Sequence, residues 1–284
     1  MKKVFYWAPC LDKVGTFKST INSALSLVKF SKKFNVYIIN TCGEWESEKY
    51  FFERNDVKVI DLNFNYFKYL PKKGFFKSRF SFLIISLFSI IPLVKLIKKE
   101  KPDYFIAHLI TLLPLSLFNL INFKTKFILR ISGFPKLNFL RKFFWRNFSK
   151  KIFKVTCPSN DLMKQLTQNN IFQKKNILFL PDPIIRVEEY LKKINKKNLN
   201  LEKIDSKYFI SVGRLTKQKN FKYLINEFKE FNNLNENYNL LIFGNGEEEK
   251  TLKTLIKNLN LSKKVFLMGY SENIYFYMKK SSAL

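Results

Sequence analysis

The sequence predicts an α/β protein of two Rossmann-like, doubly wound domains. Short runs rich in Val, Ile and aromatic residues alternate with helical segments along the 284 residues, and one charged stretch interrupts the alternation. Near-continuous apolar strands separated by helices are typical of parallel sheets covered on both faces. The interruption follows PDP at 181–183 and is centred on KKINKKNLNLEK. We therefore expect one domain over 1–182, a linker over 183–206 and a second domain over 207–284.

Each domain has its own series of elements. In the first, apolar runs predict strands over 4–9, 36–40, 57–62, 104–108, 127–131, 152–157 and 177–180. Helices are expected over 16–33, 75–99, 113–122 and 137–149, and a further helix is expected from Ser159 or Asn160, which are common capping residues. In the second domain, strands are expected over 208–212, 240–243 and 265–268, and helices over 221–234, 247–259 and 272–280.

Two apolar stretches invite comparison with a membrane span, which needs about 20 mostly apolar residues. Residues 80–94 carry no charge but fall short of that length, and they contain Pro92. Residues 104–123 reach it only if a strand and a helix are taken together. We therefore expect neither stretch to cross a membrane.

The net charge of +29 is unevenly distributed. Residues 1–61 carry ten cations and seven acids, and residues 161–284 carry twenty-two and thirteen. Residues 62–160 carry nineteen cations but only Glu100 and Asp103 as acids. AT-rich codons explain an excess of Lys and Phe, but not the loss of acids from one block. This block is expected to face an anionic partner, and the alternatives are a phospholipid surface, a phosphorylated substrate and nucleic acid.

Cysteine and histidine usage limits the chemistry. The three scattered cysteines, Cys10, Cys42 and Cys157, make neither a metal cluster nor a disulfide framework and fit a reducing cytoplasm. His108 is the single histidine. A histidine-ligated metal site or a Ser-His-Asp triad is therefore restricted to that position.

Arg214 and Lys219 lie five residues apart in SVGRLTKQKN, between a predicted strand and the helix expected from Phe221. In doubly wound sheets, ligands bind at the carboxyl ends of the strands. A helix N-terminus favours anions, and Arg adds a bidentate donor while Lys adds a point charge. The position suits a diphosphate, and the alternative is a solvated basic loop in a Lys-rich protein.

The stretch SVGRLTKQKNFKYLINEF resembles the start of the carboxy-terminal domain in family 4 of the retaining glycosyltransferases, which have the GT-B fold. The continuation from LLIFGNGEEEK to VFLMGYSEN is similar to that family's succession of strand, Gly-x-Gly, helix, strand and Gly. The amino-terminal half resembles the family more loosely, through YWAPCLDKVGTFKS, KPDYFIAHL, ILRISGFPK and VTCPS. The resemblance implies transfer of a hexose from a nucleotide-sugar with retention of configuration.

The resemblance also implies roles for individual residues. Arg214 and Lys219 match the family's cations that bind the donor diphosphate and stabilise the leaving group. Gly15 falls where the family brings backbone toward the donor phosphates. The other implied donor-binding positions are Gly213 at the strand end, Gly244 and Gly246 of the Gly-x-Gly, and Met268, Gly269 and Tyr270 where the nucleotide base lies. The alternative for the Gly-x-Gly is a plain turn between a strand and a helix.

The sequence departs from the family pattern in the first domain. Many relatives carry a histidine after the strand that ends in ILRISGFP, where this chain has Ser132 or Gly133. His108 instead ends the preceding strand, and its role is either structural or one in catalysis and acceptor positioning. No Asp-x-Asp motif is present, which fits a fold that needs no metal. The nucleotide-sugar is a co-substrate, so we expect no cofactor.

The family also carries two glutamates eight positions apart, at the start of the helix after the fourth strand of the donor domain. This sequence ends at MKKSSAL, where that strand is expected to begin beside the strand at 208–212. We therefore expect a donor domain truncated before the paired glutamates, with an exposed sheet edge, low solubility and impaired turnover.

Two segments of the basic block, 67–80 and 137–151, interleave cations with aromatic residues. The second reads as one helix whose apolar face holds Leu137, Leu140, Phe144 and Phe148, widened by Phe143 and Trp145. Such segments suit an anionic bilayer surface or RNA, and the alternative is a core helix with a solvated basic back. The chain has no recognisable nucleic-acid motif, so we expect no nucleic-acid partner.

These expectations describe a glycosyltransferase that moves a hexose from a nucleotide-sugar to a saccharide or lipid-linked acceptor, in cell-surface polysaccharide or lipopolysaccharide synthesis. It is expected in the cytoplasm, peripheral on the inner face of the cell membrane. The alternatives are a non-catalytic remnant that binds membrane or nucleotide, and a basic nucleic-acid-binding protein.

Overall fold

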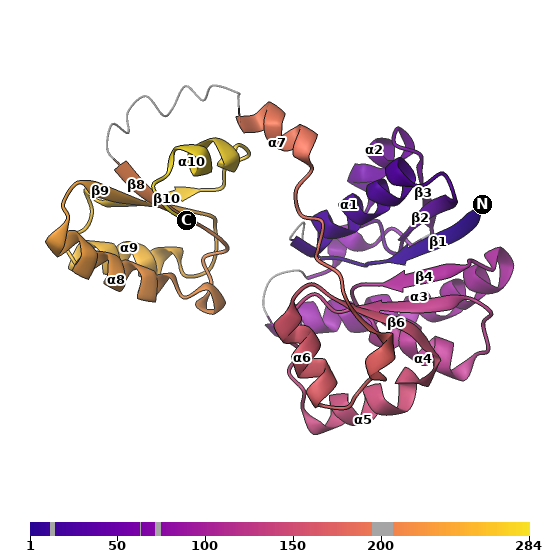
Figure 1. Cartoon of the computed structure of the whole chain (residues 1–284). Helices are drawn as coiled ribbons and strands as arrows, with labels where there is room; N and C mark the ends of the chain where they lie inside the picture. The colour runs from indigo at the N-terminus through magenta and orange to yellow at the C-terminus, as the bar shows by residue number, and fades with distance from the viewer. Residues whose placement is uncertain (12–14, 63, 72–74, 195–206) are drawn as a thin grey trace. The chain divides into compact units, whose positions relative to one another are not determined.

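The computed structural model describes residues 1–11, 15–62, 64–71, 75–194 and 207–284. The chain divides into two compact units, Met1–Ile184 and Ile185–Leu284, and both are built of helices and parallel strands (Figure 1). This confirms the predicted α/β fold of two Rossmann-like units. The segment expected to be a linker contains helix α7 (Val187–Ile194), and its residues 195–206 lie outside the described part of the chain.

The ten predicted strands are all present, each within two residues of the predicted bounds. They are β1 (Lys2–Trp7), β2 (Phe34–Asn40), β3 (Val57–Asp61), β4 (Tyr104–Ala107), β5 (Lys126–Arg130), β6 (Ile152–Cys157) and β7 (Ile177–Phe179), followed by β8 (Lys207–Val212), β9 (Tyr238–Phe243) and β10 (Val265–Gly269). The other helices are α1 (Gly15–Phe30), α2 (Lys49–Glu53), α3 (Phe75–Glu100), α4 (Leu112–Leu120), α5 (Phe139–Phe148), α6 (Asn160–Gln168), α8 (Phe221–Leu234), α9 (Glu249–Asn258) and α10 (Ile274–Lys280). Helices α2 and α7 were not predicted from the sequence. Helix α2 has only five residues, and α7 lies in a charged segment that was taken as a linker although Val187, Tyr190, Leu191 and Ile194 have helical spacing.

The amino-terminal unit is a seven-stranded parallel sheet with the strand order β3-β2-β1-β4-β5-β6-β7. Successive residues of β1 point to opposite faces, so the apolar run KVFYW is buried on both sides. Val4 and Tyr6 join the core formed with α1 and α2, whereas Phe5 and Trp7 join the core formed with α3, α4, α5 and α6. Both faces are therefore closed by helices, and the ends of the strands remain as the places for polar groups (Figure 1).

The carboxy-terminal unit is a three-stranded parallel sheet with the order β10-β9-β8. On the free side of β8, the last residues of the chain begin to pair with it in parallel. The Ile210 amide donates to the Ala283 carbonyl at 2.9 Å, and the Ser282 amide donates to the Tyr208 carbonyl at 2.8 Å. The segment after α10 therefore lies where the sequence analysis places the start of a fourth strand, next to the first.

Helix α5 departs in detail from its predicted face. Asn138 caps it by accepting from the Arg141 amide at 3.0 Å. Phe144 and Phe148 pack against the core as predicted, with stacked rings 4.0 Å apart. The prediction was wrong for Leu140 and Phe143, which are 72% and 59% exposed. The helix starts at Phe139 rather than 137, and the buried Trp145 sets its rotation, so Phe139, Leu140 and Phe143 lie on the exposed side.

Helix α3 is the longest of the described helices. Residues Phe76–Glu100 reach a mean hydropathy of 2.4 over 18 residues, so among the described residues this one helix is long and apolar enough to cross a membrane by length and composition. The stretch 104–123 separates into β4 and α4, as predicted.

Candidate functional site

The carboxyl ends of β8, β9 and β10 form one hydrogen-bonded group of loops. Gly213 donates its amide hydrogen to the Phe243 carbonyl at 2.9 Å, and Leu215 donates to Asn245 at 3.0 Å. Gly244 in turn donates to the Gly269 carbonyl at 2.8 Å. Three loops that are far apart in sequence therefore hold one another in position at the ligand edge of the sheet.

Glycine at positions 244 and 246 allows these loops to meet. A Cβ atom at Gly244 would lie 1.8 Å from the Gly213 carbonyl oxygen, and a Cβ atom at Gly246 would lie 2.2 Å from the Leu215 carbonyl oxygen. Gly244 also has φ of +139°, a conformation that residues with side chains rarely adopt. The Gly-x-Gly is thus required by backbone packing within this unit, in addition to any contact with a ligand.

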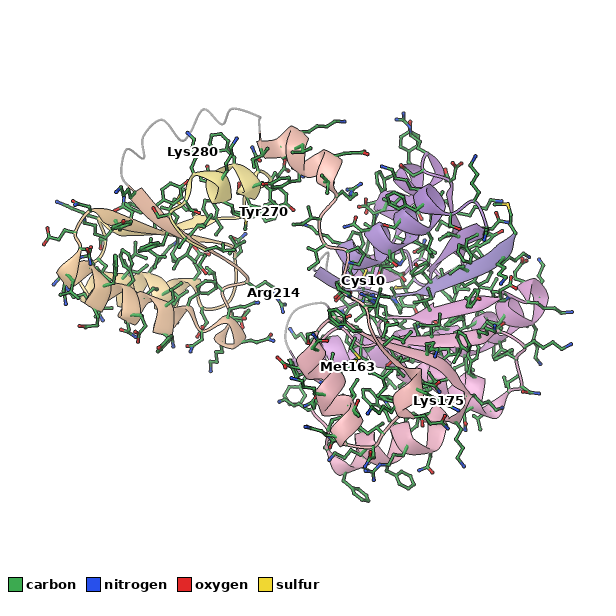
Figure 2. The ribbon with its side chains drawn as sticks, in the orientation of Figure 1. Cys10, Met163, Lys175, Arg214, Tyr270 and Lys280 are labelled. Atoms are coloured by element: carbon green, nitrogen blue, oxygen red, sulfur yellow. The ribbon has the colours of Figure 1, made fainter. Side chains whose placement is uncertain are left out.

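Arg214 lies at this edge with its side chain exposed (Figure 2). Lys219 follows on the same loop and is also exposed. A Cβ atom at Gly213 would lie 3.5 Å from Cγ of Lys219, so the stem of Lys219 runs beside the residue that precedes Arg214. Within the described part of the chain, neither cationic group makes a hydrogen bond or an ion pair. The fold thereby brings together two cations that are five positions apart and leaves both available to an anion.

The N-terminus of α8 follows this pair directly. Asn220 precedes the helix in the left-handed conformation, with φ of 49° and ψ of 43°, which asparagine tolerates better than most residues. Lys222 in the first turn forms an ion pair with the buried Glu248 at 3.5 Å. Glu248 and Lys222 were not predicted from the sequence, because the glycine packing sets the approach of the β9–α9 loop to α8.

The loop after β10 supplies an aromatic ring. Gly269 has φ of 70°, Met268 is 37% exposed and Tyr270 is 74% exposed at the edge of the unit (Figure 2). An exposed ring with an open face can stack on a nucleobase. These residues lie near the loop of Gly244, because a Cβ atom at Gly269 would be 3.6 Å from the side-chain oxygen of Asn245.

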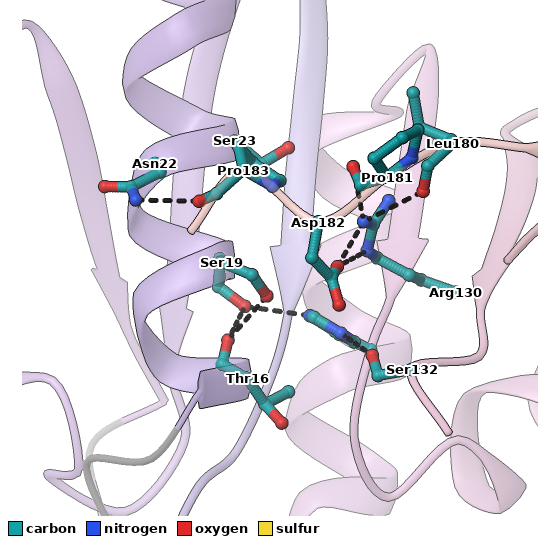
Figure 3. A network of polar contacts seen from close by, with 12 residues as sticks. Thr16, Ser19, Asn22, Ser23, Arg130, Ser132, Leu180, Pro181, Asp182 and Pro183 are labelled. Atoms are coloured by element: carbon teal, nitrogen blue, oxygen red, sulfur yellow. Dashed lines mark hydrogen bonds and ion pairs between the residues drawn. The ribbon is translucent and has the colours of Figure 1, made fainter. Parts of the chain in front are cut away.

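In the amino-terminal unit, the carboxyl ends of β4 and β5 hold a polar network around His108. Figure 3 labels Ser132, Arg130 and Asp182 of this network. The imidazole is buried between Thr20 on α1, at 3.0 Å from Nδ1, and Ser132 after β5, which contacts Nε2. The Thr20 hydroxyl donates its hydrogen to the Thr16 carbonyl at 2.9 Å. Thr20 must therefore accept from Nδ1, which leaves Nε2 to accept from the exposed Ser132 hydroxyl.

Burial keeps this histidine neutral. It lowers the pKa of the His108 imidazole to about 4, and the nearby Arg130 guanidinium adds to the lowering, against the opposite effect of Asp182. At neutral pH the ring is thus a fixed acceptor for Ser132. The arrangement can orient a hydroxyl group, and it is unsuited to carrying positive charge.

Arg130 fixes the chain that leaves this unit. Its guanidinium donates to Asp182 through Nε at 2.8 Å and through a second, shorter contact, and it also reaches the Pro181 carbonyl at 3.2 Å (Figure 3). Asn22 on α1 donates to the Pro183 carbonyl at 2.7 Å. The PDP motif is therefore attached to the carboxyl edge of the sheet through a buried ion pair, which the sequence analysis did not foresee.

Gly15 is the first residue of α1, and no described heavy atom lies within 4 Å of a Cβ atom built there. It follows residues 12–14, which lie outside the described part of the chain. Gly15 is exposed, in the helix that follows β1 along the chain. In the described residues, no group of three or more His, Cys, Asp or Glu side chains is arranged to hold a metal ion.

Comparison with known proteins gives independent evidence. Residues 192–284 match the profile of the family described as glycosyl transferases group 1. The chain is 28% identical to an uncharacterised glycosyltransferase of Methanocaldococcus jannaschii over 208 residues, which cover 67% of this chain and 51% of that protein. It is 30% identical over 165 residues to a Campylobacter jejuni enzyme named N-acetylgalactosamine-N,N'-diacetylbacillosaminyl-diphospho-undecaprenol 4-alpha-N-acetylgalactosaminyltransferase, covering 55% of this chain and 43% of that protein. The chain thus spans about half the length of these relatives.

Solved structures resemble almost the whole chain. A glycosyltransferase from Rickettsia africae has a TM-score of 0.70 at 18% identity, covering 99% of this chain and 71% of that protein. HepE from Anabaena, solved in complex with UDP and glucose, has a TM-score of 0.67 at 13% identity, covering 99% and 72%. The fold is GT-B. We name residues 207–284, which lie within the segment that matches the group 1 profile, the group 1 domain.

The structure places the predicted residues of the group 1 domain together. Gly213, Arg214 and Lys219 lie on one loop, and the loops of Gly244–Gly246 and Met268–Tyr270 are hydrogen-bonded to it or lie beside it. His108 and Gly15 belong to the other unit and lie at the carboxyl edge of its own sheet. Their contact with a donor or an acceptor stays a prediction.

We predict that Gly244→Ala destabilises the group 1 domain by roughly 2–4 kcal/mol, because overlap with the Gly213 carbonyl adds to the strain of a positive φ. Hydrogen exchange of peptides that cover β8 and β9, followed by mass spectrometry, measures the loss locally. Gly133→Ala is the control, since no atom lies within 4 Å of a Cβ atom there. Equal protection of β8 and β9 in the two variants would contradict this account of the loop packing.

A second prediction concerns the buried imidazole. Because the folded pKa of His108 lies below the ordinary value of 6.5, the unfolded chain binds the extra proton first as pH falls. Stability from this group is complete above about pH 6.5 and is lost toward pH 4. Between pH 7 and pH 5 the loss should be about 2 kcal/mol, and it should be absent in His108→Gln.

Urea unfolding followed by tryptophan fluorescence measures this, because Trp7, Trp45 and Trp145 all lie in the amino-terminal unit. Other titrating groups are common to both proteins, so the difference between them isolates His108. If the wild-type chain and His108→Gln lose equal stability from pH 7 to pH 5, the imidazole is not held neutral by the fold.

Proposed function

We propose that the protein transfers a hexose from a nucleotide-sugar, with retention of configuration, to a saccharide or lipid-linked acceptor in cell-surface polysaccharide or lipopolysaccharide synthesis. The observation that carries this proposal is the pair Arg214 and Lys219, exposed together at the carboxyl edge of the group 1 domain. As the bond to the sugar breaks, negative charge develops on the leaving diphosphate. A guanidinium and an ammonium that are already in place stabilise that charge without rearrangement.

In this proposal, the neighbouring loops bind the nucleoside part of the donor. Tyr270 offers its exposed ring to the base, and the close packing at Gly244 and Gly246 keeps the cation-bearing loop at a fixed distance from it. The structural neighbour HepE was solved with UDP and glucose, which supports a uridine nucleotide as the probe for this site. Arg214 and Lys219 supply the positive charge, so the proposal requires no metal ion and no cofactor.

On the acceptor side, the proposal gives His108 a positioning role. Its neutral ring holds the exposed Ser132 hydroxyl, and the two lie at the carboxyl edge where doubly wound sheets bind ligands. The Campylobacter jejuni relative is named for a diphospho-undecaprenol acceptor, which supports a lipid-linked acceptor here. We place the protein in the cytoplasm, peripheral on the inner face of the cell membrane, with 67–80 and 137–151 toward anionic lipid.

The donor site predicts a specific loss in binding. Arg214→Ala removes charge-assisted hydrogen bonds worth about 1.5–3 kcal/mol each, so the Kd for UDP should rise roughly ten- to hundredfold. Isothermal titration calorimetry measures it. Lys217→Ala is the matched control, because Lys217 is an exposed cation on the same turn, and its effect should stay within about threefold through screening by salt. If both variants lose equal affinity for UDP, Arg214 has no specific role, and the loop attracts anions only through its overall charge.

The basic segments make a separate prediction. The protein should sediment with vesicles that contain anionic lipid more than with neutral ones, and added salt should weaken the binding. Changing Arg141, Lys142 and Arg146 together to Gln should lower the bound fraction, since each cation near an anionic surface contributes about 1 kcal/mol. If the protein sediments equally with neutral and anionic vesicles, the cations of α5 do not contribute to membrane binding.

A further inference from the structure

Helix α3 carries an apolar stripe on the side that faces away from its unit. Phe80, Leu83, Leu87, Ile90 and Ile91 fall within about 100° of one another around the helix and are between 38% and 65% exposed. We name these five residues the α3 stripe. A soluble helix normally directs polar residues outward. Here the most apolar side is exposed, and contiguous exposed apolar surface of this kind marks an interaction site.

The buried side of α3 is firmly part of the protein. Ile85, Leu93 and Ile97 are at most 1% exposed and pack into the cores of the amino-terminal unit. The buried Ser81 hydroxyl lies 2.6 Å from the Pro71 carbonyl. Crossing a membrane would require this side to leave its core. Although α3 has the length and composition of a span, its packing favours a position along a surface.

The placement of α3 brings the stripe near the ligand edge. The helix is 26 residues long, about 39 Å, whereas the longest strand of its sheet, β2, has seven residues and spans about 23 Å. The amino-terminal half of α3 packs through Ile85 on Leu11, Cys42 and Leu70, which lie in segments that follow the carboxyl ends of β1, β2 and β3. The stripe therefore extends past the carboxyl edge of the sheet.

Charge surrounds the stripe with one sign. No acidic residue occurs between Asp61 and Glu100, while Lys77, Arg79, Lys95 and Lys98 lie exposed toward the two ends of α3. Helix α3 contacts α4, and α4 contacts α5, so the exposed Phe139, Leu140 and Phe143 belong to the same helical layer of the sheet.

We infer that α3 lies in the headgroup region of an anionic bilayer, with the α3 stripe buried at the boundary of the acyl chains and the flanking cations extended toward phosphate. The charge around the α3 stripe favours a bilayer over a second copy of the chain as the partner of this surface. Two copies joined through α3 would bring their cations together, and the region from 62 to 99 has no acid to pair with them. A bilayer with anionic lipid supplies both the apolar depth and the counter-charge.

This inference rests on the peripheral membrane placement in the proposed function and deepens it, since it assigns the apolar surface that enters the bilayer. It agrees with a lipid-linked acceptor, because the carboxyl edge that holds His108 and Ser132 would lie close to the membrane. Its experiments use vesicles without substrate. UDP binding by the group 1 domain tests the proposed function separately, so either can fail alone.

The first experiment removes the stripe. In Leu83→Gln/Leu87→Gln/Ile91→Gln, binding to vesicles of phosphatidylethanolamine and phosphatidylglycerol should weaken at least tenfold, with circular dichroism unchanged. The matched control is Phe30→Gln/Leu191→Gln/Leu234→Gln, which removes three exposed apolar side chains elsewhere and should bind as the wild type does. Equal binding by the two triple variants overturns the inference. A second result would also overturn the inference. In that result the wild-type chain is a dimer in sedimentation velocity, and the stripe variant is a monomer that still binds vesicles.

The second experiment reports depth directly and does not depend on a loss of binding. Trp7, Trp45 and Trp145 are buried, so a tryptophan placed at an exposed position reports mainly its own surroundings. Leu87→Trp should be blue-shifted and quenched by vesicles with brominated acyl chains, whereas Leu234→Trp should not. Quenching that is the same at both positions places α3 outside the bilayer and overturns the inference.

Discussion

A parallel sheet that is covered by helices on both faces leaves its strand ends as the places where polar side chains can gather. Both units of this protein obey that constraint. In the amino-terminal unit, alternate residues of β1 fill two separate cores, and the network of His108, Ser132, Arg130 and Asp182 gathers at the carboxyl edge. In the group 1 domain, the same edge collects Arg214, Lys219 and Tyr270. In both units, the polar and charged side chains of the candidate sites therefore lie at the carboxyl ends of the strands.

The strands and most helices could be predicted from the sequence, because each depends on a pattern of neighbouring residues. An apolar run such as KVFYW is short and rich in Val and aromatic residues, which favours a strand, and all ten strands lie within two residues of ranges predicted from such runs. The pair Arg214 and Lys219 was also predictable, because a strand, a turn and a helix start within ten residues place both cations at one edge. The errors at Leu140 and Phe143 came from centring the predicted apolar face on Leu137 and Leu140. The buried Trp145 instead marks the inward side of the helix, which leaves Leu140 and Phe143 toward solvent.

The rest of the candidate site depends on contacts that are distant in sequence. His108 meets Thr20 across 88 positions, and Arg130 meets Asp182 across 52. No local pattern in the sequence encodes such pairs, and each matters because burial makes an unpaired polar group costly. The need for glycine at 244 and 246 is of the same kind, since it arises from the carbonyl oxygens of Gly213 and Leu215 on another loop. The family pattern pointed to these glycines, but the reason for them appears only in three dimensions.

Two kinds of interaction would hold helix α3 at a bilayer: electrostatic attraction of its cations and burial of its apolar side chains. Cations attract an anionic bilayer from a distance, at about 1 kcal/mol each, and salt screens this attraction over about 8 Å. Full burial of a Leu, Ile or Phe side chain contributes about 1.5–3 kcal/mol, and since the five stripe residues are already partly covered, roughly half of that remains for each. The apolar part is therefore comparable to the contribution of several cations and persists in salt. A transmembrane position would instead expose the core at Ile85, Leu93 and Ile97, where losing each buried side chain costs about 2–5 kcal/mol. The balance favours a helix that lies on the bilayer while its inner side stays in the protein, so that one element both completes the core and holds the ligand edge near lipid.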